Sequence, residues 1–306
     1  MSQNRNTPSG NRRNRNYHHY NNKHKINIGD KGKEILENID ENNAVIKQFR
    51  GYATELDNKH DRYERIFKYS RDITIESKRI IYLLHTLNKE SNKDAIFVDA
   101  KTRLDNLAKT LFQNIAQELN HQDSYQYLRA YSGGLQEYIE AITFYNYLSE
   151  NKLPDWSDIE KNLTYKTLPT NCDEVNLSDE QNITTTNEEI KTLITPTEYI
   201  LGVADLTGEL MRKCINNLAS GDITSCYQTC NLVRDMHMGF IGCVGICGKE
   251  IRRKLYVLKQ SLIKMENVCY TVKVRGSEIP KHMLAEVAIG AAEEYPTEDD
   301  EGYQAY

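Results

Sequence analysis

The sequence has no run of uncharged apolar residues approaching the roughly 18 to 20 that a transmembrane helix needs. Residues 1–25 lack the apolar segment of a secretory signal peptide. The chain also has no internal repeat and no series of alternating apolar and polar residues of the kind that strands show. These absences argue against a membrane-spanning protein and a sheet-based fold, so we expect a soluble all-α protein with no membrane partner.

Seven cysteines without an export signal indicate a reducing compartment in which the thiols stay free. The net charge of -5 gives the molecule no general attraction to phosphate, so any nucleic-acid site has to be a local patch. Charge is concentrated at the two ends. Residues 1–33 form a basic Asn/Arg-rich tail that we expect to be disordered, and residues 289–306 form an acidic, solvated tail.

Between the tails, residues 34–288 have the pattern of one domain of about seven long antiparallel helices. Residues 168–195 lose this periodicity and are rich in Asn, Thr, Asp and Glu, which indicates a loop or insertion. Thr195 is a suitable N-cap, and Pro196 a favourable first-turn residue, for the helix that follows. The expected helices are 41–88, 104–119, 124–148, a short stretch from about 154, 196–219, 222–238 and 249–273.

Glycines interrupt this helical pattern at two places. Gly133 and Gly134 lie inside the expected helix 124–148, where each costs about 1 kcal/mol relative to alanine, so the pair suggests close packing or a kink. The glycine-rich segment GFIGCVGICG (239–248) predicts a break between the last two long helices.

Glu137 occupies an unusual place in the expected helix 124–148. On a helical wheel of residues 135–148 it falls inside a continuous apolar half, with Glu140 about 60° away at the edge. An ionised carboxylate buried alone costs several kcal/mol or becomes protonated, so the position requires a cation or a partner. Mg²⁺ prefers oxygen ligands and can activate water against a phosphate. Glu137 and Glu140 are therefore candidate metal ligands.

The helix after Pro196 carries a second polar stripe, in which Asp205 and Glu209 share a face with Arg212 and Asn216. Any amphipathic helix has such a stripe, and Arg212 can pair with a carboxylate. Spacing alone therefore favours a structural ion-pair network over a metal site.

Long segments around these carboxylates resemble the translin-associated factor X family. The resemblance covers nearly all of the chain except the two tails and residues 168–195, and long colinear stretches are more specific than a short motif. The matching segments are GLQEYIEA (134–141), TPTEYILGVADLTGELMRKCIN (195–216), KLYVLKQSLIKMENVCYTVKVRGSEIPKHML (254–284) and ELDNKHDRYERIFKYSRDITIESKRIIYLLH (55–85).

The resemblance implies a protein that assembles with the related protein translin into a closed hetero-oligomeric barrel that cleaves single-stranded RNA. It implies that this chain is the catalytic subunit, a Mg²⁺-dependent endoribonuclease that is active only within the assembly. The family's QEYxEA motif and the aspartate of GVADLTGE fall on Glu137, Glu140 and Asp205 as catalytic metal ligands, with Glu209 as a further candidate. The implied substrates are passenger-strand fragments in RNA silencing and tRNA fragments, with single-stranded DNA as a further ligand.

A rival hypothesis is a non-catalytic scaffold or nucleic-acid-binding partner of translin. The intact carboxylates argue against it, because a scaffold has no need of a carboxylate in an apolar arc. We expect the protein in both cytoplasm and nucleus. Arg12, Arg13 and Arg15 in the tail resemble a nuclear-import or RNA-contacting segment, but an alternating Asn/Arg tract is a weak signal and does not decide between the two.

Basic residues between positions 59 and 71 could follow an RNA backbone. Acidic residues interleave with them at i,i+4 spacing, which favours a solvated, salt-bridged face instead. The basic residues are Lys59, Arg62, Arg65, Lys68 and Arg71, and the acidic ones are Asp61, Glu64 and Asp72.

Two cysteine pairs at i,i+4 spacing, Cys226 with Cys230 and Cys243 with Cys247, raise the question of zinc. Their C-x₃-C spacing differs from the C-x₂-C of common zinc ribbons, and a free cysteine usually behaves as a small buried apolar residue. The spacing therefore favours buried thiols over a metal site.

Overall fold

The computed structural model describes most of the central region of the chain. The N-terminal tail and, apart from residue 290, the acidic C-terminal tail lie outside the described residues, so the disorder expected there stays a prediction. The chain divides into two compact units, Met1–Leu56 and Asp57–Tyr306, and the packing discussed below lies within the second. The described residues are 39, 40, 42–88, 92–166, 189–245, 248–276, 278, 280, 283 and 290.

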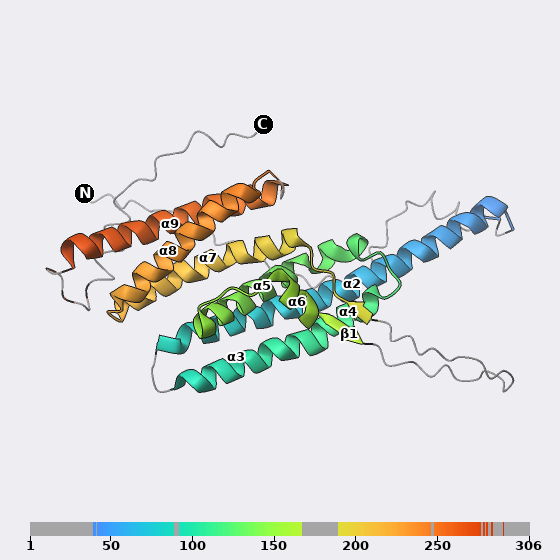
Figure 1. Ribbon diagram of the computed structural model, residues 1–306. Coiled ribbons are helices and arrows are strands. Elements are labelled where there is room, and N and C mark those ends of the chain that lie inside the picture. The colour runs from blue at the N-terminus through green and yellow to red at the C-terminus, as the bar shows by residue number, and fades with distance from the viewer. Residues whose placement is uncertain are drawn as a thin grey trace, which may run out of the picture. The chain divides into compact units, whose positions relative to one another are not determined.

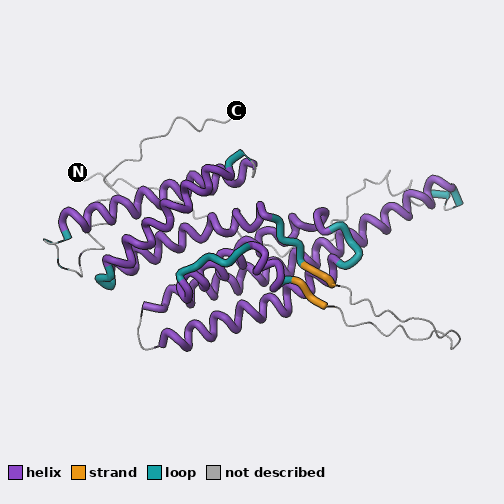
Figure 2. Tube along the Cα trace, viewed as in Figure 1, coloured by secondary structure: helices purple, strands orange, loops and turns teal. Residues whose placement is uncertain are grey.

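Helices account for most of the described residues (Figure 1; purple in Figure 2). With α3, η3 and α4 taken as one continuous helix, they number seven within the described part, which confirms the expected all-α fold. None of them combines the length and the apolar character of a membrane span. Their bounds are α2 Ala44–His85, η1 Thr86–Asn88, α3 Lys93–Leu107, η3 Ala108–Phe112, α4 Gln113–Leu119, α5 Ser124–Glu150, α6 Trp156–Asn162, α7 Pro196–Ala219, α8 Ile223–Cys243 and α9 Gly248–Arg275.

Local signals fix the start of α7. The hydroxyl of Thr195 accepts a hydrogen bond from the backbone N–H of Glu198 at 3.2 Å, and Pro196 occupies the first turn, as expected. By contrast, α8 continues through Gly239 and Gly242 to Cys243. The helix therefore ends later than expected, because the sequence predicted a break that begins at residue 239. Nothing lies within 4 Å of a Cβ at either glycine, and a helix can tolerate glycine where no packing depends on it.

A short β-hairpin occupies part of the region expected to be a loop. Strand β1 (Thr164–Lys166) pairs antiparallel with β2 (Glu189–Lys191), so part of the expected loop or insertion at 168–195 forms a strand (orange in Figure 2). Strands this short carry too few residues to show alternation. The hairpin region also binds the π-helical turn η3, because Tyr165 donates to the carbonyl of Ala108 at 2.6 Å and Thr192 to that of Phe112 at 2.8 Å.

The apolar stripes expected from the sequence form the core. Ile73, Ile80 and Leu84 of α2 are fully buried, and burial of each such side chain contributes about 1.5–3 kcal/mol. Leu111 is only partly buried, although its stripe neighbour Ile115 has no exposed surface. Leu111 lies within η3, where the wider π turn shifts the phase of the stripe.

Helix α7 packs against α5, α8 and α9 (Figure 1). Short turns join α7 to α8 and α8 to α9, so these neighbours run antiparallel as expected. Helices α5 and α7 instead run in the same direction, because residues later in α5 contact residues later in the segment that contains α7. Tyr131 donates to the carbonyl of Leu193 at 3.0 Å, and farther on Gln136 donates to Glu198 at 2.5 Å. The connection through α6 and the hairpin returns the chain to the start of α5.

Candidate functional site

The close approach of α5 and α7 depends on Gly202. A Cβ at this position would lie 2.7 Å from the Cβ of Ile139 and 2.9 Å from the carbonyl oxygen of Gln136, both in α5. Only glycine permits that separation of the two helices. Glu140 lies one residue beyond Ile139, and Asp205 lies three beyond Gly202, so the same contact brings the predicted carboxylates of the two helices together.

All four predicted carboxylates line a single cavity of about 600 Å³. Helix α5 supplies Glu137 and Glu140, and α7 supplies Asp205 and Glu209. Lys78 and other α2 residues form the opposite wall. The predicted site residues are therefore brought together, whereas Asn216 does not line the cavity. The lining residues are Lys78, Ile81, Tyr82, Glu137, Glu140, Asp205, Glu209 and Arg212.

Glu140 is the most deeply placed carboxylate, with 8% of its surface exposed. No hydrogen bond or ion pair within the described part of the chain engages its side chain. Burial, followed by repulsion from Asp205, Glu137 and Glu209, raises the pKa of Glu140 to about 8.

Glu137 is only half-buried and forms an ion pair of 2.9 Å with Lys78 of α2. The inference that Glu137 is the anomalous buried carboxylate is therefore wrong in detail, because that description fits Glu140. A helical wheel of one helix does not reveal that a neighbouring helix places a lysine beside Glu137.

Asp205 contacts a lysine from α9. The ammonium of Lys254 donates to Asp205 Oδ2 at 2.6 Å, to Gln136 Oε1 at 2.9 Å and to the carbonyl oxygen of Leu201 at 3.1 Å. With a side chain only 18% exposed, Lys254 joins three helices at the edge of the cavity. Sequence reasoning missed this residue because a lysine beside the apolar stripe of an exposed helix is commonplace.

Glu209 has two partners on the same carboxylate oxygen. His85 Nε2 lies 2.5 Å from Glu209 Oε2, and Arg212 Nη1 donates to that oxygen at 3.0 Å, as the ion-pair interpretation expected for Arg212. The imidazole of His85 packs against Phe144, with ring centroids 4.9 Å apart. Because the other ring nitrogen of His85 is buried without a hydrogen-bond partner in the described structure, the ring has one strong polar contact, to Glu209.

The site keeps an excess of negative charge when every carboxylate is ionised. Four carboxylates face the three permanent cations Lys78, Arg212 and Lys254, and His85 is neutral unless it is protonated. Glu140 is the carboxylate without a direct cation. A bound cation would remove both the desolvation cost and the repulsion that raise its pKa.

The donor set suits a hard divalent ion, although the carboxylates do not form a tight cage. No three of them bring their oxygens within 4.8 Å of one another in the described part of the chain. Mg²⁺ usually keeps several waters and takes only one or two carboxylates directly, so this spacing fits a hydrated ion. Closer ligation would require Glu137 or Asp205 to release its lysine.

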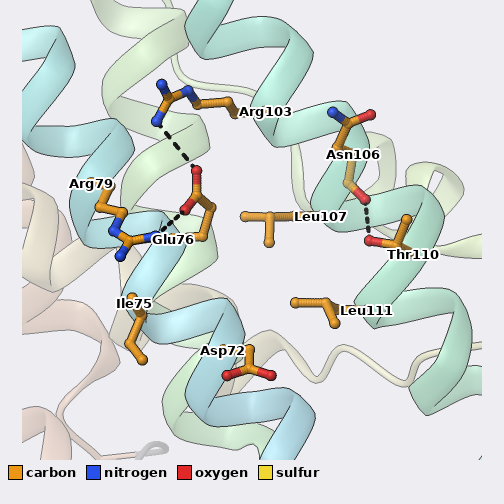
Figure 3. A pocket seen from close by; sticks show the side chains of 9 residues that line it. All are labelled: Asp72, Ile75, Glu76, Arg79, Arg103, Asn106, Leu107, Thr110 and Leu111. Atoms are coloured by element: carbon orange, nitrogen blue, oxygen red, sulfur yellow. Dashed lines mark hydrogen bonds and ion pairs between the residues drawn. The ribbon is translucent and has the colours of Figure 1, made fainter.

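A second hollow, of about 470 Å³, lies between α2 and α3 (Figure 3). Glu76 lies between Arg79 and Arg103 and pairs with them at 3.2 and 3.3 Å, and Arg103 also pairs with Asp99. Leu107 and other apolar side chains also line the hollow. The arginines are neutralised within the hollow, so it offers little attraction to phosphate.

The basic face expected near residues 59–71 is salt-bridged, but partly to another helix. Arg65 donates to both carboxylate oxygens of Glu118 in α4, at 2.6 and 2.9 Å, and Arg62 lies 3.6 Å from the same group. The structural interpretation of these two arginines is therefore confirmed, with Glu118 rather than a neighbour in the same helix as the observed direct partner.

Comparisons with known proteins agree with this architecture. Residues 61–276 match the Translin family. Translin-associated protein X of Pongo abelii is 43% identical over 251 residues, which cover 81% of this chain and 85% of that protein. The protein of the same name from Rattus norvegicus is 44% identical over 245 residues, with coverages of 79% and 83%. The structure of an AfC3PO–duplex RNA complex has the same fold, with a TM-score of 0.50 and 18% identity over 79% of this chain and 97% of that one.

Proposed function

Because the chain belongs to the translin family, we propose that it is the catalytic subunit of a translin-containing endoribonuclease. Its site would be the carboxylate cavity, with Glu137, Glu140 and Asp205 as catalytic ligands of Mg²⁺ and Glu209 as a further ligand. The substrate would be single-stranded RNA, such as passenger-strand or tRNA fragments, in the cytoplasm and nucleus.

The observation that carries the proposal is the state of Glu140. A buried carboxylate without a cation partner, beside three more carboxylates, is costly for a purely structural network. In a purely structural cluster, either a cation partner or an uncharged residue at this position would remove the cost. A metal-binding site instead retains it, because the ligand has to stay available for the ion.

The surrounding side chains have separate roles in this proposal. Lys78 and Lys254 hold Glu137 and Asp205 in place at 2.9 and 2.6 Å. His85 and Arg212 orient Glu209. When bound, Mg²⁺ supplies polarisation of the scissile phosphate and a lowered pKa of the attacking water.

The assembly is part of the proposal. AfC3PO, which shares the fold, forms a complex with duplex RNA, and the mammalian relatives carry the name translin-associated. We therefore expect this chain to bind RNA within a hetero-oligomer with translin. The isolated chain should be poorly soluble or inactive.

Co-expression with a translin partner provides the test. Purified complexes are incubated with a labelled single-stranded RNA in Mg²⁺ or in EDTA, and cleavage is followed over time. We expect cleavage in Mg²⁺ only, and its loss in Glu140→Gln and Asp205→Asn. Glu118→Gln is the matched control, because it removes a partly buried, ion-paired carboxylate that does not line the cavity.

Size-exclusion profiles establish that each variant assembles. If assembled Glu140→Gln and Asp205→Asn complexes cut RNA at the parental rate, the catalytic assignment is wrong. If the parental complex binds the RNA but does not cleave it, the result would favour the rival hypothesis of a scaffold or nucleic-acid-binding subunit.

A further inference from the structure

Four cysteines gather where the second half of α7 meets α8 and α9. Cys214 comes from α7, Cys226 and Cys230 from α8, and Cys269 from α9, and none is more than 8% exposed. Cys243 is half-buried and is not among the sulfurs that converge in the described part of the chain, and Cys247 lies outside the described residues. Spacing along the sequence did not indicate Cys214 and Cys269, which come from other helices.

The thiols of Cys214, Cys226 and Cys269 converge on one point. Their three sulfur atoms all lie within 4.8 Å of one another. The Sγ atoms of Cys214 and Cys226 are 2.8 Å apart, and those of Cys226 and Cys269 are 3.8 Å apart. Isolated buried cysteines behave as small apolar residues and have no reason to converge.

These separations are close to those of a metal–thiolate centre. A zinc–sulfur bond of about 2.3 Å in a tetrahedron places neighbouring sulfurs about 3.8 Å apart. The Cys226–Cys269 distance equals this value, and the Cys214–Cys226 pair would open by about 1 Å on binding. On this basis, we infer that Cys214, Cys226 and Cys269 bind Zn²⁺, with Cys230 as the fourth ligand.

Cys230 is placed to complete the centre. It lies one helical turn beyond Cys226 in α8, and only 2% of its surface is exposed. Its sulfur is not among the three that lie within 4.8 Å of one another, so it has to turn inward to reach the ion. Such a centre would join α7, α8 and α9.

A neighbouring tyrosine fixes the backbone beside one of the proposed ligands. The hydroxyl of Tyr227 donates to the backbone carbonyl of Cys269 at 3.1 Å and so fixes the segment that carries this ligand.

The test uses the full chain, co-purified with its partner without a metal-binding tag. After zinc is removed under reducing conditions, the complex is titrated with Co²⁺, whose bonds to thiolates give a charge-transfer absorption that carboxylate ligands do not. Zn²⁺ should then abolish the absorption. We expect about one thiolate-bound ion per chain, and a loss of affinity of at least about 100-fold in Cys214→Ala and Cys269→Ala. Cys230→Ala should change the cobalt spectrum, whereas Cys243→Ala should leave it unchanged.

A parental complex without the charge-transfer band would overturn the inference. So would equal binding by Cys214→Ala and Cys243→Ala, or a mass lower by two hydrogens that marks a Cys214–Cys226 disulfide in the reduced preparation. These readouts hold even if a variant fails to fold, because the parental spectrum decides by itself. They are also independent of RNA cleavage, so the outcome does not depend on the function of the carboxylate cavity.

Discussion

Lys254 Nζ lies 2.6 Å from Asp205 Oδ2, which connects the last long helix to the carboxylate cavity. The same ammonium donates to Gln136 and to the carbonyl of Leu201, so one side chain joins α5, α7 and α9. Asp205 is in this way held by a protein cation at the position where a metal ion would also bind. If the proposed function is right, the ion pair and the metal site would be two states of one arrangement.

Replacing Lys254 tests this relationship. Lys254→Met should lower the free energy of unfolding by about 1–3 kcal/mol without divalent ions, because three acceptors lose a partly buried donor. Mg²⁺ should stabilise this variant more than the parental complex, since it would replace the missing positive charge. Urea titrations with and without Mg²⁺ measure both effects. Lys101→Met, which removes an exposed i,i+4 pair with Asp105, should change stability by less than about 1 kcal/mol. Equal responses of the two variants to Mg²⁺ would contradict the prediction.

The pKa of Glu140, raised to about 8, makes stability depend on pH. The folded protein holds this proton more tightly than the unfolded chain, so the contribution is fully present below the ordinary carboxyl pKa of 4.5 and is lost as pH rises to about 8. The loss should amount to a few kcal/mol at most in the absence of Mg²⁺. Glu140→Gln should flatten the slope, and unfolding measured across this pH range checks it. An unchanged slope in the variant would mean that other groups cause the effect.

Metal binding should have the opposite dependence on pH. Because the ion displaces the Glu140 proton, Mg²⁺ affinity should rise by up to about tenfold per pH unit until pH approaches about 8. Burial is the largest cause of the raised pKa of Glu140, followed by the charges of Asp205, Glu137 and Glu209, which Lys254 opposes. Calorimetric titrations in two buffers of different ionisation enthalpy count the protons released. No proton release near pH 7 would show that Glu140 is not a ligand.

Several features of the fold followed from the sequence because they depend on local chemistry. The start of α7 could be predicted from the capping of Thr195 and the fixed backbone of Pro196. Helical spacing indicated the polar faces that carry the carboxylates, but only the family resemblance grouped those of the two helices into one site. The depth of Glu140 could not be predicted, because it depends on which side of α5 faces α2. The same holds for Lys254 and for the cysteine cluster, whose members come from different helices.

Gly202 provides a test of helix separation that leaves every functional group in place. Gly202→Ala would force its Cβ against Ile139 and the Gln136 carbonyl, so α5 and α7 should move apart and RNA cleavage should fall by about tenfold or more. Gly208→Ala in the same helix is the matched control, since its Cβ would have no neighbour within 4 Å. Cleavage rates of assembled complexes provide the comparison. Equal rates for the two variants would mean that the site tolerates a change in helix spacing.

The two glycines of α5 should respond oppositely to alanine. A Cβ at Gly134 would lie 2.5 Å from the backbone carbonyl oxygen of Ser70 and 2.8 Å from its hydroxyl, which accepts a hydrogen bond from the Gly134 N–H. Gly134→Ala should therefore push α5 from α2 and lower the free energy of unfolding by about 1–3 kcal/mol.

Gly133 is exposed, and a Cβ there would have no neighbour within 4 Å. Gly133→Ala should raise the free energy of unfolding by up to about 1 kcal/mol, because alanine has the higher helix propensity and lowers the entropy of the unfolded chain. Urea denaturation of both variants measures the difference. The comparison distinguishes two explanations of the glycine pair. Close packing at Gly134 predicts destabilisation by Gly134→Ala alone, whereas a kink that requires both glycines predicts destabilisation by either substitution.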